Sequence, residues 1–113
     1  MSLPPWPLAW SLNPRKTVEY LLNAHHAEGG PKARFFLRFG FTQEAPDHLA
    51  YELLSHARPE TYAGQAISRF GDMKYLFEGP IRAPDGRMPR IRTVWRIDVN
   101  RTAHFVTAVP MTA

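Results

Sequence analysis

Three side chains in the second half of the sequence could together cleave a phosphodiester bond of RNA without a metal ion. Such cleavage needs a base that takes the proton of the 2′-hydroxyl, an acid that protonates the leaving 5′-oxygen, and fixed positive charge beside the phosphate. His104, Tyr75 and Arg92 have the side-chain types for these roles. Histidine and tyrosine on strands are also common structural residues, so the trio is a hypothesis about catalysis rather than a recognised motif.

Four further cations could bind phosphate groups. Lys32 and Arg34 fall in the first turn of an expected helix, where free backbone amides already attract anions. Arg96 follows Arg92 at strand spacing, so both face one side of an expected strand, and Lys74 lies on the strand before it. The alternative is that these cations only solvate a helix surface and an exposed sheet face.

The positive charge is concentrated in the second half of the chain. Residues 1–68 contain six basic and six acidic side chains, whereas residues 69–113 contain eight basic ones, seven of them arginine, and four acidic ones. Arginine forms bidentate contacts with phosphate and carboxylate groups. We therefore expect the second half to face a polyanion such as RNA, or an acidic protein.

Several chemistries are excluded by what the sequence lacks. The absence of cysteine excludes disulfides, thiolate metal sites and a cysteine nucleophile. His25, His26 and Glu28 lie in a loop without the spacing of a metal-binding pair, and His48 and His56 are too far apart on one helix to chelate together, so we expect no metal and no cofactor. The sequence has no glycine-rich phosphate loop, nucleophile elbow or dinucleotide fingerprint.

We expect a cytoplasmic protein that does not bind membranes. No apolar run approaches the roughly 18 residues that a membrane span requires. The N-terminus also lacks the basic region of a signal peptide.

The elements that must position these residues change type near Ala63. Before it, apolar residues recur at helical spacing and predict three helices: one that begins at Asn13 and Pro14, one over residues 31–39 that ends at Gly40, and one over residues 43–57. After it, a period of two predicts strands over residues 64–70, 73–81, 89–99 and 103–109. The expected fold class is α+β, with three N-terminal helices packed on one face of a four-stranded antiparallel sheet.

The length of 113 residues fits one domain, which we place at residues 13–110. Residues 1–12 contain three prolines, two tryptophans and no charge, so they should lie extended across the core with Trp6 or Trp10 as an anchor. Residues 1–3 could equally be a remnant of an expression vector. The expected core contains large apolar residues from both halves, namely Phe36, Leu37, Leu49, Leu53, Trp95 and Ile97.

Three strings carry a resemblance to a known family: YLLN with GGPKARFFLRFGF, then FGDMKYLFEGPIRAPDGR, then IRTVWRID with HFVTAVP. In this order they resemble an uncharacterised bacterial domain family of similar length, found alone and at the C-terminal ends of polymorphic toxins. The resemblance runs from about Asn13 to Pro110 and covers Lys32, Tyr75 and Arg92. At position 104 the family tends to have arginine where this chain has histidine.

The resemblance implies a toxin-type function. Toxin domains with helices followed by a sheet resemble the small metal-independent ribonucleases that include barnase-like, RelE-like and colicin-like toxins. Our leading interpretation is therefore a metal-independent ribonuclease. The alternative is a non-enzymatic interaction module that binds an acidic protein, or a second copy of itself through an exposed sheet edge or through the tryptophan-bearing N-terminal segment.

Overall fold

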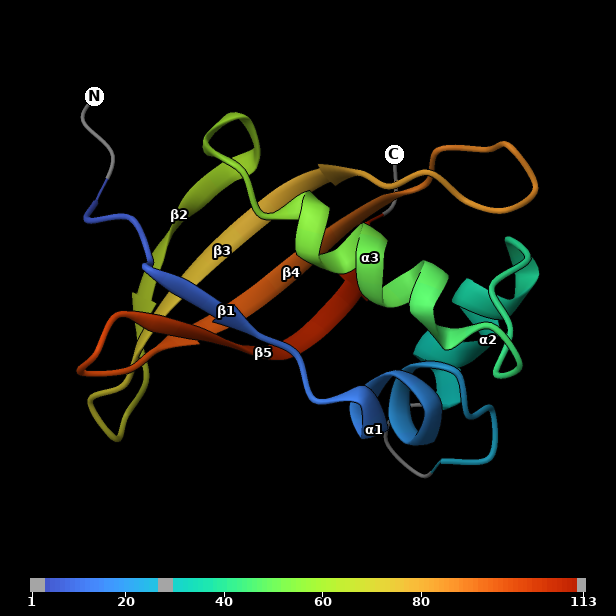
Figure 1. Ribbon diagram of the computed structural model, residues 1–113, viewed down its shortest axis with the longest axis horizontal. Helices are drawn as coiled ribbons and strands as arrows, with labels where there is room; N and C mark the ends of the chain where they lie inside the picture. The colour runs from blue at the N-terminus through green and yellow to red at the C-terminus, as the bar shows by residue number, and fades with distance from the viewer. Residues whose placement is uncertain (1–3, 27–29, 112–113) are drawn as a thin grey trace.

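The computed structural model describes residues 4–26 and 30–111 and forms an α+β fold around one five-stranded mixed sheet (Figure 1). The proposed vector remnant at residues 1–3 lies outside the described residues. The spatial order of the strands is β1-β5-β4-β3-β2. Neighbouring strands are antiparallel except β1, which pairs parallel with β5. The strands are β1 (Ala9–Ser11), β2 (Tyr62–Ile67), β3 (Met73–Pro80), β4 (Arg90–Ile97) and β5 (Thr102–Pro110).

The prediction of three N-terminal helices on a four-stranded antiparallel sheet is wrong, because the N-terminal segment supplies a fifth strand before any helix. Its residues are extended, as expected, and Trp10 packs edge-on against Trp95 with 5.1 Å between ring centroids. The pairing of Ala9–Ser11 with residues 102–104 joins segments that are more than ninety positions apart. Local periodicity carries no signal for such a contact, so the sequence could not indicate it.

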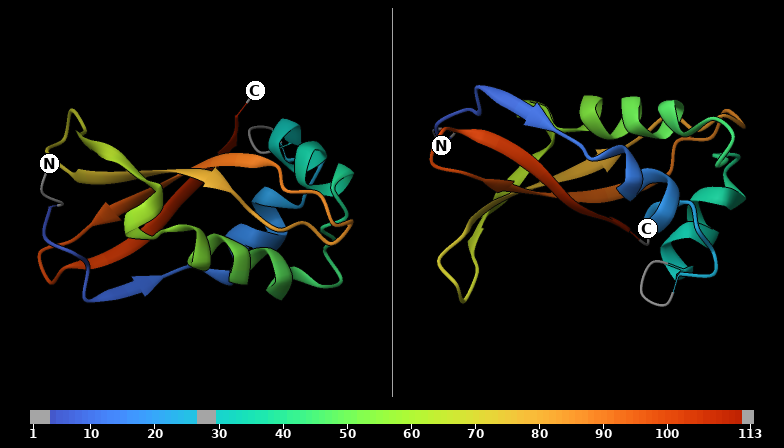
Figure 2. Two further views of the ribbon diagram at one scale, coloured as in Figure 1. Left: turned by 90° about the horizontal axis from the view of Figure 1, so that it is seen from above. Right: turned by 60° about the horizontal axis from the view of Figure 1, so that its bottom comes forward.

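The helices also differ from the prediction in their placement. They are α1 (Pro14–Lys16), which continues as the π-helix η1 (Thr17–Leu21), then α2 (Gly30–Arg38), α3 (Pro46–His56) and the short 3-10 helix η2 (Pro59–Thr61). α3 lies over one face of the sheet, whereas α1, η1 and α2 gather at one end of it (Figure 2). α3 begins at Pro46, three residues after the expected start, because proline is favoured at the first helical position.

The end of α2 matches the prediction. Gly40 has a φ of 100°, the left-handed conformation that glycine adopts without a steric penalty. Of the expected core residues, Phe36, Leu49, Leu53 and Trp95 are fully buried and Ile97 packs against the core from a half-buried position. Leu37 is 36% exposed and is not among the buried core residues, although it lies one helical turn after the buried Ala33.

The two faces of the sheet have different chemistry. We call the face under α3 the closed face; its side chains are buried and, apart from one threonine, apolar, namely Tyr75, Phe77, Ile91, Thr93, Trp95, Ala103 and Phe105. The opposite face, which we call the open face, carries side chains that alternate with these along each strand and are half-buried or exposed. On the three central strands they are Lys74, Leu76, Glu78, Arg92, Val94, Arg96, His104, Thr107 and Val109.

A buried hydrogen-bond network connects α3 to the closed face. His56 at the end of α3 lies within 3.1 Å of the carbonyl oxygen of Gly79 through Nε2, and within 2.9 Å of Oγ1 of Thr93 through Nδ1. The carbonyl can only accept, so Nε2 donates and the neutral ring accepts the hydroxyl proton of Thr93 at Nδ1. Oγ1 of Thr93 in turn accepts from Nε1 of Trp95 at 3.0 Å. Burial lowers the pKa of His56 and keeps the ring neutral.

Candidate catalytic site on the open face

Three of the predicted cationic or titratable residues lie in one row across the open face. Arg96 of β4 is the register partner of Lys74 on one side and of His104 on the other. Residues directly opposite on neighbouring strands point to the same face, so these three side chains face one region of solvent. The sequence predicted that each residue lies on a strand, and the register of the sheet brings them together.

A β-bulge in β5 brings a further polar residue to this face, beside the row. Trp95 pairs with Phe105 and Val94 pairs with Thr107, so Val106 is the extra residue of the bulge. Because of the bulge, Thr107 faces the open side. Its partner Val94 is the next open-face residue after Arg96 along β4, so Thr107 lies beside the Arg96–His104 pair. Two residues of strand span about 7 Å, which is close enough for one nucleotide to contact both positions.

Lys32 of α2 reaches the open face at this point. Its Nζ donates to Oγ1 of Thr107 at 2.9 Å and to the hydroxyl oxygen of Tyr20 at 2.8 Å. The ammonium group also lies 5.1 Å from the centroid of the Tyr20 ring. None of the ion pairs among the described residues involves Lys32, so its charge is not neutralised by a carboxylate there.

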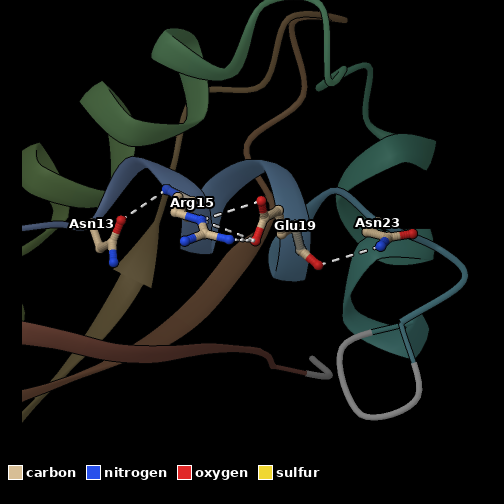
Figure 3. A network of polar contacts seen from close by, with 4 residues as sticks. All are labelled: Asn13, Arg15, Glu19 and Asn23. Carbon is tan, nitrogen blue, oxygen red and sulfur yellow. Dashed lines mark hydrogen bonds and ion pairs between the residues drawn. The ribbon is translucent and has the colours of Figure 1, made fainter.

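The segment α1–η1 holds Tyr20 beside Lys32 at one end of the sheet. The side chain of Asn13 accepts from the backbone N–H of Arg15 and caps the helix, and Arg15 forms an ion pair with Glu19 one turn later (Figure 3). The side-chain amide of Asn23 then donates to the carbonyl oxygen of Glu19 at the end of η1. Beside this cap, Nζ of Lys16 donates to the carbonyl oxygen of the bulge residue Val106 at 2.7 Å and ties the segment to β5.

His104 is oriented by a carboxylate. Its Nε2 lies 2.8 Å from Oδ2 of Asp98, and this hydrogen bond is the main cause that lowers the pKa of Asp98. With Nε2 donating to Asp98, Nδ1 of the neutral ring is left as a proton acceptor. The side chain of His104 is 35% exposed, so a ligand on the open face can approach it.

The structure separates the other predicted catalytic residues from His104. Tyr75 points to the closed face, is 4% exposed, and donates its hydroxyl proton to the carbonyl oxygen of Pro5 at 2.9 Å. Arg92 does face the open side, two residue pairs from Arg96, where its Nε donates to Glu78 at 2.7 Å. Arg34 is exposed on α2 and has no ion pair among the described residues.

The turn Pro84-Asp85-Gly86-Arg87 between β3 and β4 contacts α2 and is not part of this site. The guanidinium of Arg87 lies 4.2 Å from the centroid of the Phe39 ring and donates to the carbonyl oxygen of Arg38, so the loop between β3 and β4 is fixed to the end of α2. Asp85 accepts from Arg87, and these hydrogen bonds lower the pKa of its carboxyl group.

In the described part of the chain, no three histidine or acidic side chains come close enough together to hold a metal ion. Within the same residues, no helix is both long and apolar enough to cross a membrane.

Tyr20 and Thr107 were not among the residues predicted for the site. Tyr20 lies on the helix predicted to begin at Asn13 and Pro14, for which no site residue was proposed, and strict alternation from His104 assigns Thr107 to the buried face. Only the contact with Lys32 and the bulge at Val106 reveal them.

The fold defines the class of this protein as a small α+β domain with one covered and one polar sheet face. It is similar to a chain from a contact-dependent growth inhibition toxin–immunity protein complex of Klebsiella pneumoniae 342, with a TM-score of 0.72, 14% sequence identity, and coverage of 90% of this chain and 93% of that chain. At this identity the similarity shows the fold alone. Residues 8–112 match the model of the family described as domain of unknown function DUF6883, and the chain belongs to this family. No curated protein sequence matches it.

Proposed function

We propose that this domain is a toxin-type ribonuclease that cleaves RNA without a metal ion, using the open face as its active site. The grouping of Lys32, Tyr20 and Thr107 beside the Arg96–His104 pair is the observation that carries the proposal. The similarity of the fold to a chain of a toxin–immunity complex adds support for a toxin-related role.

In this mechanism His104 is the base. Asp98 holds its Nε2 proton, so Nδ1 takes the proton from the 2′-hydroxyl of the nucleotide. The 2′-oxygen then attacks the phosphorus, the bond to the 5′-oxygen breaks, and a 2′,3′-cyclic phosphate forms. The protonated His104 is stabilised by the carboxylate of Asp98 during this step.

Lys32 and Arg96 supply the positive charge for the phosphorane. Lys32 is held in place by Tyr20 and Thr107, so its ammonium group does not have to be reorganised when the substrate binds. The hydroxyl group of Tyr20, whose oxygen accepts from this ammonium, protonates the leaving 5′-oxygen. Arg92, Lys74 and Arg34 bind neighbouring phosphates through salt-sensitive contacts.

The test is cleavage of a mixed-sequence single-stranded RNA by the full chain in the presence of EDTA. We expect products that end in a 2′,3′-cyclic phosphate, identified by mass spectrometry. His104→Ala should reduce the rate by about 100-fold or more, because it removes the general base. Expression of the wild-type chain should be toxic to bacteria, and expression of the variant should not.

The matched control is Arg82→Ala, which removes an exposed cation just after β3; the hydrogen bond of this residue to Glu52 uses its backbone N–H and is kept. It should cleave RNA at a rate close to that of the wild type. A wild-type chain that neither cleaves RNA nor binds it in a salt-dependent way would overturn the proposal and favour an interaction module for an acidic protein. A rate that does not change in His104→Ala would overturn the assignment of the base.

A further inference from the structure

One cavity of the molecule has a largely apolar lining and shares no residue with the site on the open face. Its volume is about 300 Å³, and it lies between α3 and the segment that runs from β1 into η1. Its walls are formed mainly by apolar side chains of these elements, namely Trp10, Leu12, Val18, Ala50 and Leu54. Two other cavities of similar volume are lined by several charged side chains. Pockets that bind small molecules are mostly apolar and contain a few polar groups, so this cavity has the composition of a ligand site.

The walls of this cavity are fixed by contacts within the protein. On one side, Trp10 packs edge-on against the buried Trp95. On the other side, Nε2 of Gln43 donates to the carbonyl oxygen of Val18 at 3.0 Å and ties η1 to the loop before α3. α3 also contacts η1 directly. The cavity therefore has its shape before anything binds, as is usual for small-molecule sites.

A buried hydroxyl group in the wall has no hydrogen-bond partner. Thr17, the first residue of η1, lines the cavity and is 1% exposed. A threonine in a helix usually donates its hydroxyl proton to a carbonyl oxygen of the preceding turn. Oγ1 of Thr17 has no such bond, and it has none to any other described residue. Valine has nearly the same shape and would avoid the unpaired group, so the hydroxyl points to a ligand that pairs with it.

The charge around the cavity selects against anions. None of the residues that line it is basic. Asp47, in the first turn of α3, lines the cavity from an exposed position and forms no ion pair with a described residue. A carboxylate without a compensating cation repels a negatively charged molecule. Phosphate groups, which the open face attracts, are therefore disfavoured in this cavity.

We propose that this cavity binds a small uncharged aromatic molecule that carries one N–H or O–H group. The aromatic body packs against the ring of Trp10 and the aliphatic side chains around it, and the N–H or O–H group donates to Oγ1 of Thr17. The volume is at the lower end of the range for ligand pockets, roughly 300–1,000 Å³, which limits the ligand to a small size. The proposal does not depend on the ribonuclease activity, because none of these residues belongs to the site on the open face.

The test is a fluorescence titration of the full chain with N-phenylnaphthylamine, an uncharged aromatic molecule with one N–H group. Its fluorescence increases when it leaves water, so the titration measures binding directly. We expect saturable binding of about one molecule per chain. Anilinonaphthalenesulfonate has the same aromatic body and a negative charge, and it should bind about tenfold more weakly because Asp47 repels it.

Three variants test the residues of the cavity. Thr17→Val should weaken the binding of N-phenylnaphthylamine by about threefold to tenfold, because it removes the hydroxyl and keeps the shape. The same variant should unfold at the wild-type temperature or above it, since it removes an unpaired buried group. Ala50→Leu should weaken binding by about tenfold or more, because the larger side chain fills part of the cavity. Asp47→Asn should increase the affinity for the anionic probe and leave that for the uncharged probe unchanged.

Thr42→Val is the control, because it makes the same change at an exposed threonine that does not line the cavity. It should bind like the wild type, and circular dichroism should show that all variants are folded. A wild type without saturable binding would overturn the proposal. Equal binding by the wild type, Thr17→Val and Ala50→Leu would also overturn it, because the probe would then lie elsewhere. A wild type that binds the anionic probe as tightly as the uncharged one would overturn the class of ligand.

Discussion

The closed and open faces of the sheet each have a histidine at their surface, one from α3 and one from β5, and the two residues have opposite environments. His56 contacts the closed face, is 2% exposed, and has both ring nitrogens in hydrogen bonds to Thr93 and Gly79. His104 lies on the open face, has one nitrogen on Asp98, and keeps part of its ring in solvent. Both nitrogens of His56 therefore have partners within the protein, whereas His104 keeps one ring nitrogen that a substrate could contact.

The same difference holds for the other residues that sequence analysis treated alike. Tyr75 and His104 both lie on central strands, but the hydroxyl of Tyr75 serves to hold the N-terminal segment at Pro5. Lys32 and Arg34 share the first turns of α2, but only Lys32 turns toward the sheet and contacts Thr107. Chemical type therefore identifies candidates, and the face on which a residue lies decides whether it can act on a ligand.

The largest effect on folding should be seen when two neighbouring residues of β4 that face opposite sides of the sheet are compared. Trp95→Ala should lower the free energy of unfolding by about 3–5 kcal/mol, because Trp95 is fully buried and also holds the hydroxyl of Thr93. Val94→Ala, on the open face, should cost about 1 kcal/mol or less. Urea denaturation measures both values. Equal losses would contradict the distinction between the two faces.

The largest effect on activity should come from replacing Lys32, whereas replacing its neighbour Arg34 should have little effect. Lys32→Met should reduce RNA cleavage by about 100-fold, equivalent to about 2.7 kcal/mol of transition-state stabilisation, while the fold is retained. Arg34→Met should change the rate by only a few fold, because its exposed cation can be replaced by solvent and salt. Single-turnover rates in EDTA measure the effect. Similar rates for the two variants would show that α2 contributes only general positive charge.

The smallest effect should be the dependence of stability on the protonation of His56. Its pKa is lowered in the folded protein, first by burial and also by the charges of Arg58 and Arg90, whereas the unfolded chain titrates near the ordinary value of about 6.5. Unfolding therefore takes up a proton at low pH. The stability that neutral His56 contributes is complete above about pH 6.5 and decreases as the pH falls toward the folded-state pKa.

His56→Gln isolates this contribution from the other histidines. The difference in the free energy of unfolding between the wild type and this variant should shrink between about pH 7 and pH 5, because only the wild type loses stability through position 56. Urea denaturation at a series of pH values measures it. A difference that is constant or that grows as the pH falls would contradict the neutral, buried state of His56.

The sequence by itself determined the elements whose signals are local. The period of the apolar residues and the prolines and glycines at their ends indicated the change from helices to strands near Ala63, the end of α2 at Gly40, and four of the buried core residues. Alternation along β4 correctly separated Arg92 and Arg96 from Trp95, because side chains on a strand point to opposite faces at every step.

Only the tertiary structure decided which of these residues meet. The fifth strand depends on a pairing between Ala9–Ser11 and the far end of the chain, and the position of Thr107 depends on a bulge at Val106 that interrupts the alternation. Lys32, Tyr20 and Thr107 come from three separate elements, and nothing in their local spacing relates one to another. Local sequence limits the backbone conformation of each segment, whereas contacts between distant segments depend on how all the buried surfaces pack at once.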